Sequence, residues 1–109
     1  MAVYMFQVTY GSAALGSLIA QPQDRGEAIR KPIEKLGGKL IGVWFSFGEY
    51  DTVAIVEMPD HIAAAAFALA IAAGGSVKAQ KTTPLLSIED GKAALKKATT
   101  SGYKPISAK

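Results

Sequence analysis

Four polar or aromatic side chains gather in one part of this sequence, where they could bind a small molecule. Trp44, Ser46, Asp51 and Glu57 occupy alternate positions of two adjacent strand-like runs, and this alternation points them to one side of a sheet. The face mixes an indole, a hydroxyl and two carboxylates with aliphatic side chains. Such a face is typical of a sheet that meets a second sheet or lines a cavity.

Three further residues complete the candidate site. Tyr4 and Phe6 belong to an apolar N-terminal run, and we expect them to line the same cavity. Arg25 precedes a predicted helix and could contact an anion or reach the carboxylate of Asp51.

Each polar candidate also has a purely structural interpretation. Asp51 directly follows a tight turn, where a carboxylate commonly accepts backbone hydrogen bonds. Trp44 could belong to the core or to an interface, and Glu57 could pair with Lys39 or Lys78. The arginine could form an ion pair on the helix surface.

The composition excludes several kinds of chemistry. The chain has no cysteine, which rules out disulfides, thiolate catalysis and cysteine-based metal sites. His61 is the single histidine, which argues against a histidine-rich metal site or a Ser-His-Asp triad within one chain. We therefore expect no metal and no cofactor, and the residues leave open whether the protein is an enzyme.

The net charge of +3 comes from the C-terminal segment. Residues 1–84 hold seven basic and seven acidic residues, whereas residues 85–109 hold five lysines and two acids. Nucleic-acid binding usually requires a broader basic surface, so the pattern predicts a solvated tail and no nucleic-acid partner. No signal sequence is visible, and no apolar run reaches the roughly 20 residues that span a bilayer. We expect a cytoplasmic protein.

The region from Gly38 to Asp60 predicts a hairpin with its turn at residues 47–50. This turn pairs Ser46 with Asp51, Trp44 with Val53, and Leu40 with Glu57. The opposite face of the hairpin is expected to form the core, and it carries Ile41, Val43, Phe45, Phe47, Tyr50, Thr52, Ala54, Val56 and Met58.

The remaining elements follow from hydrophobic periodicity and from caps. The pattern predicts a strand over 3–9, helical segments over 12–19 and 22–36, a helix over 60–74 and a strand over 77–83. The order β-α-β-β-α-β is that of the ferredoxin-like plan, with two helices on one face of a four-stranded antiparallel sheet. We therefore predict an α+β domain over residues 1–88 and a basic helix and tail over 89–109, with Ala94 and Leu95 against the body.

Two apolar surfaces remain without a cover in this plan. The mixed sheet face exceeds what a monomer normally exposes, so we predict that a second copy packs sheet to sheet into a dimeric α/β barrel. The helix over 60–74 is apolar all round; we place Ile62, Ala66, Leu69 and Ala73 toward the sheet. Phe67 and Ile71 then need either the tail or another subunit.

Three motifs together resemble the GYD domain family. They are Gly37-Gly38, Gly48-Glu49-Tyr50-Asp51 and Glu57-Met58-Pro59-Asp60, and Asp24-Arg25 ahead of the first long helix is similar as well. The resemblance covers roughly residues 3–88 and implies a ferredoxin-like, dimeric α/β-barrel protein. It implies no reaction, and the lysine-rich tail departs from the family pattern.

Two functions remain open from the sequence. The first is small-molecule binding in a barrel cavity, with or without catalysis. The second is a non-catalytic module whose apolar surfaces serve homo-oligomerisation or other interactions. An enclosed pocket with converging polar groups favours the first, and a filled interface favours the second.

Overall fold

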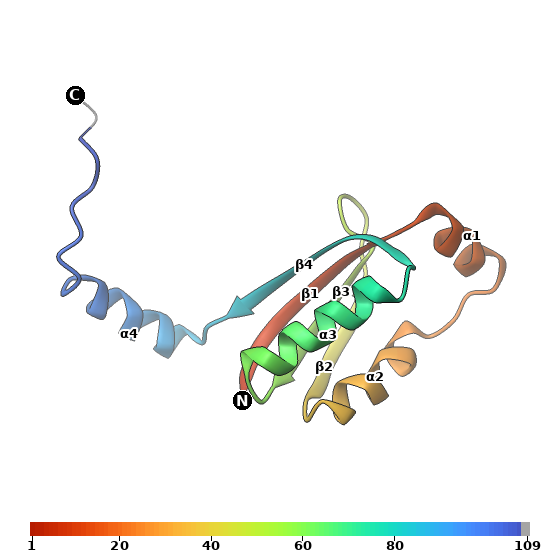
Figure 1. The fold of residues 1–109 in the computed structure, drawn as a ribbon, viewed down its shortest axis with the longest axis horizontal. Helices are drawn as coiled ribbons and strands as arrows, with labels where there is room; N and C mark the ends of the chain where they lie inside the picture. The colour runs from red at the N-terminus through yellow and green to blue at the C-terminus, as the bar shows by residue number, and fades with distance from the viewer. Residues whose placement is uncertain (108–109) are drawn as a thin grey trace.

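The computed structural model describes residues 1–107, which form a four-stranded antiparallel sheet with helices on one face (Figure 1). The strands are β1 (Ala2–Tyr10), β2 (Lys39–Phe45), β3 (Thr52–Met58) and β4 (Val77–Leu85). They lie side by side in the order β2-β3-β1-β4. The helices are α1 (Ser12–Ala20), α2 (Arg25–Lys35), α3 (His61–Ala73) and α4 (Ile88–Ala98). This arrangement confirms the α+β class and the predicted chain order of the elements.

The core lies between the sheet and helices α2 and α3. Ile33, Val56 and Met58 are fully buried, and the rings of Phe6 and Phe67 meet edge to face with centroids 5.1 Å apart, a geometry that aromatic pairs favour. Ile29 and Leu36 pack against this cluster from α2. Their spacing with Ile33 follows the helical period.

The hairpin register agrees with the prediction only on one side of a β-bulge. Trp44 pairs with Val53 as expected, but the register shifts between Leu40 and Gly42, so that Leu40 pairs with Val56 instead of Glu57. A bulge inserts one extra residue into a strand. The residues of β2 that precede the bulge therefore point to the face of the sheet opposite to the one predicted. Leu40 is therefore buried and Ile41 exposed, the opposite of the expectation.

Two predicted core positions of the hairpin are also corrected. Phe45 shares the helix-covered side with its partner Thr52 but remains largely exposed at the sheet edge, and Phe47 is fully exposed in the loop. Strand β2 is the edge strand, and no described residue covers these two rings.

The side of α3 that packs against the sheet differs from the prediction as well. Phe67 is buried in the core and Ile71 packs against it, whereas Ile62 and Leu69 are each 70% exposed. The helix has apolar residues all round and no Asp, Glu, Lys or Arg from His61 to Ala73, so hydrophobic periodicity cannot define which side is buried. The uncovered stripe is centred on Ile62 and Leu69.

Helix α4 stands away from the rest of the molecule beyond the end of β4 (Figure 1). Leu95 is 73% exposed, so the expected packing of Ala94 and Leu95 on the body is wrong for a single chain. The Cα radius of gyration is 17.4 Å, compared with about 13 Å expected for a compact domain of this length. The projecting segment accounts for this excess.

Candidate functional site

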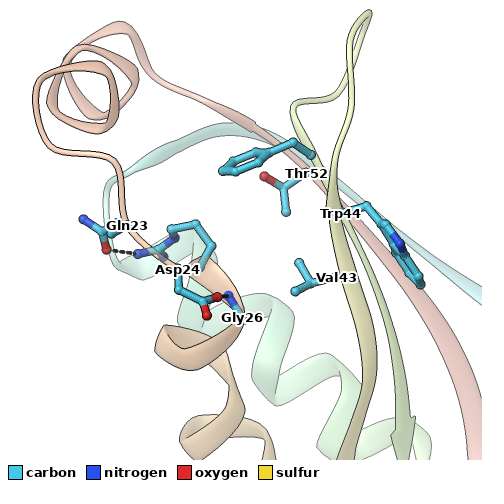
Figure 2. A pocket seen from close by; sticks show the side chains of 8 residues that line it. Gln23, Asp24, Gly26, Val43, Trp44 and Thr52 are labelled. Atoms are coloured by element: carbon cyan, nitrogen blue, oxygen red, sulfur yellow. Dashed lines mark hydrogen bonds between the residues drawn. The ribbon is translucent and has the colours of Figure 1, made fainter.

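The six cavity candidates lie on both sides of the sheet. Tyr4 and Phe6 are buried on the helix-covered side, because β1 places them opposite Val56 and Ala54 of the core. Trp44 points to the other side (Figure 2), and no helix among residues 1–107 covers that side (Figure 1). The structure therefore corrects the expected placement of Tyr4 and Phe6 on one face with Trp44.

The open face of the sheet keeps its mixed character. Trp44 is 56% exposed, and its indole lies over Gly42, since a Cβ atom built there would be 2.6 Å from Trp44 Cη2. Glu57 lies on the same face opposite Val3 and Lys39. Within residues 1–107 its carboxylate forms no ion pair with Lys39 or Lys78. We define the open face by its members, which are Val3, Met5, Gln7, Gly42, Trp44, Val53, Ile55, Glu57, Lys81, Thr83 and Leu85.

Asp51 and Ser46 bind backbone groups of their own chain. Asp51 Oδ2 accepts a hydrogen bond of 2.9 Å from the backbone N–H of Tyr10, and the Asp51 N–H donates to the Val8 carbonyl at 2.8 Å. Ser46 Oγ donates to the Tyr50 carbonyl at 2.6 Å. Asp51 thus joins the hairpin to the end of β1 and is neither in bulk water nor confined to its own turn.

An open groove of about 490 Å³ lies next to Asp51. Its lining includes two acidic residues, Glu49 and Asp51, and one basic residue, Lys78. The groove is formed where the end of β1, the start of α1, the hairpin loop and the start of β4 meet, and it is lined by Thr9, Tyr10, Ser12, Leu15, Gly48, Glu49, Tyr50, Asp51, Lys78 and Ala79.

A second group of cavities surrounds Arg25 on the helix-covered side. Asp24 caps α2, with Oδ1 accepting from the N–H groups of Gly26 at 2.9 Å and Glu27 at 3.3 Å. Figure 2 shows this helix start facing Val43 and Thr52 of the sheet across a pocket of about 110 Å³, while Trp44 points away from it. Arg25 lines this pocket and is separated by the sheet from the open face.

Sequence reasoning did not identify two polar residues near Arg25. Tyr10 and Thr52 are both buried, and Thr52 Oγ1 donates to Tyr10 Oη at 3.0 Å. Both line a cavity with Arg25. They are 42 positions apart in the chain, and only the β1–β3 pairing brings them together, so no local motif could reveal the pair.

Within residues 1–107 no cluster of three or more His, Asp or Glu side chains could hold a metal ion. No helix among these residues is long and apolar enough to cross a membrane.

The fold and the hairpin motif together define a small α+β domain with two helices against one face of an antiparallel sheet. The family model of the GYD domain matches residues 4–95, and the chain belongs to this family. The match extends through β4 and most of α4.

Among solved structures, the chain is similar to one titled "Crystal Structure of MtbAldR". The sequences are 22% identical with a TM-score of 0.53, and the similarity covers 79% of this chain and 52% of that chain. At this identity the similarity shows the fold alone, and this chain matches about half the length of that protein. No curated protein matches the chain.

Proposed function

We propose that this GYD domain protein is a homodimer that binds a small molecule in an α/β-barrel cavity between two sheets. The observation that carries the proposal is the open face, where Trp44 is 56% exposed amid aliphatic side chains and no described helix covers it. A single sheet rarely leaves such a face in water. A second copy would cover it.

The proposed cavity would use the polar and aromatic groups of this face. Trp44 offers an indole surface and Glu57 offers a carboxylate with no ion pair among residues 1–107. Ser46 and Asp51 lie at the hairpin end of this face but bind their own backbone. We place the protein in the cytoplasm as part of this proposal.

A second candidate function is a non-catalytic oligomerisation module. It is favoured by the engagement of Ser46 and Asp51 within the chain, which leaves few free polar groups to hold a ligand in the barrel. In this case the two open faces would pack against each other without a cavity.

Light scattering coupled to size exclusion tests the dimer. We expect the 11.4 kDa chain to elute at twice its mass or more at micromolar concentration. Trp44→Glu should give monomers, because a carboxylate would enter a dry contact. Phe47→Glu is the matched control, since Phe47 is exposed in the loop, and it should leave the assembly intact. A wild-type monomer would contradict the proposal.

Native mass spectrometry then separates the two candidate functions. A dimer that releases a small molecule on denaturation supports the binding function. A dimer of two bare chains, purified under the same mild conditions, supports the oligomerisation module.

A further inference from the structure

Arg25 lies where three neighbouring cavities share a wall on the helix-covered side of the sheet. Their volumes are about 110, 60 and 200 Å³, and Arg25 lines all three. This position is independent of the proposed barrel cavity, because the sheet separates it from the open face.

The guanidinium of Arg25 has few acceptors in its own chain. Nη1 donates to Gln23 Oε1 at 3.0 Å, Nε is buried without a hydrogen-bond partner, and no ion pair is formed with any carboxylate among residues 1–107. An arginine remains charged in proteins and carries five N–H donors. A partly buried cation with unused donors is stabilised by an anion, and a carboxylate fits its geometry well.

Tyr10 provides a further donor in the same cavity. Its hydroxyl oxygen accepts the hydrogen bond from Thr52 Oγ1, and a phenolic hydroxyl can donate one hydrogen bond as well. Both side chains are buried and line the 60 Å³ cavity with Arg25.

The rest of that cavity is apolar. Its other lining residues are Phe6, Val8, Ile29, Ala54, Phe67, Ile71 and Val77. At about 60 Å³ it is the smallest of the three cavities that Arg25 lines. This space suits a short alkyl chain better than a long one.

We propose that this cavity binds a short-chain monocarboxylate, with its carboxylate on Arg25 and Tyr10 and its alkyl tail among Phe6, Val8 and Phe67. Asp24 favours a single negative charge on the ligand. Its carboxylate borders the adjoining 110 Å³ pocket and would repel a dianion such as phosphate more strongly.

Isothermal titration of the full chain with butyrate tests this site. Arg25→Gln should weaken binding at least tenfold, and Tyr10→Phe should weaken it severalfold while keeping the ring that fills the core. Arg30→Gln is the matched control: it removes an exposed arginine of the same helix, which pairs with Glu27 at 3.5 Å, and should leave the affinity unchanged. Butylamine and octanoate should bind at least tenfold more weakly than butyrate.

Amide NMR spectra locate the bound butyrate. We expect shifts at Gly26 and Thr52 in the wild type, and also in a monomeric Trp44→Glu variant, because the site does not need the dimer. Unchanged butyrate affinity in folded Arg25→Gln and Tyr10→Phe variants, equal affinity for butylamine or phosphate, or shifts confined to the open face would overturn the proposal. Failure of the dimer test alone would leave this site standing.

Discussion

The carboxylate of Asp51 joins two segments that are 41 positions apart in the chain. Within the family signature, Gly48 and Asp51 each have a physical role. Gly48 adopts φ +135°, a region that side chains rarely occupy, and Asp51 accepts from the Tyr10 N–H where the β1–β3 pairing ends. The sequence predicted that Asp51 either caps its own turn or lines a site. It could not predict a partner that only the tertiary fold brings close.

Substitution of Asp51 measures this connection. Asp51→Asn keeps an acceptor oxygen and should lower the free energy of unfolding by about 1 kcal/mol or less, whereas Asp51→Ala leaves a part-buried N–H unsatisfied and should cost about 1–3 kcal/mol. Urea unfolding measures both. Glu49→Ala in the same loop is the control, because the Glu49 side chain forms no hydrogen bond or ion pair within residues 1–107.

A different result for the Asp51→Asn variant would show that Asp51 binds a ligand. If Asp51→Asn were as stable as the wild type yet lost a small molecule that co-purifies with it, the carboxylate would serve binding. An equal, large destabilisation by Asn and Ala would show that the negative charge itself holds the hairpin.

At the scale of the elements, close backbone approach positions the Arg25 cavity. Gly26 is buried at the start of α2, and a Cβ atom there would lie 2.9 Å from Val43 Cγ1 and 3.0 Å from Asp24 Oδ1. Hydrophobic periodicity and caps predicted whether each element is a helix or a strand. They did not predict which side is buried in two elements, the start of β2 and α3. Gly42, an isolated glycine inside the β2 pattern, is the local signal of the bulge near Ile41, but an isolated glycine can also mark a close backbone approach, so it did not fix the register. The uniformly apolar α3 has no polar side that could show which side is buried.

Gly26→Ala tests this close approach. The added methyl group should push α2 away from β2 and lower the free energy of unfolding by about 1–3 kcal/mol through overpacking, which exceeds the gain of up to about 1 kcal/mol in helix propensity. Gly16→Ala in α1 is the matched control, since apart from its chain neighbours and the adjacent backbone of its own helix no described atom lies within 4 Å of its Cβ position, and it should stabilise or leave stability unchanged. Thermal unfolding of both variants compares them. A Gly26→Ala protein as stable as the wild type would show that the α2–β2 contact adjusts freely.

At the scale of the whole molecule, two apolar stripes remain uncovered within one chain. Ile62 and Leu69 face outward from α3, and Ile88 and Leu95 are exposed on α4. Helical periodicity predicted α4 as an amphipathic helix, but whether it packs on its own domain depends on the path of the chain after Leu85. That path has no periodic signal, and the structure carries α4 away from the body.

Deletion of residues 86–109 tests what these stripes do. The domain should remain folded, with its unfolding midpoint changed by less than about 4 °C, which corresponds to under about 1 kcal/mol, because α4 contributes little to the core. We expect the full chain to assemble beyond the dimer through α3 and α4, and the truncated chain to elute as a dimer held by the open face. Deletion of residues 99–109 alone is the matched control, since it keeps α4 and should keep the larger assembly. A truncated protein whose assembly is unchanged would show that α4 does not cover the α3 stripe, and one that unfolds would show that α4 stabilises the domain itself.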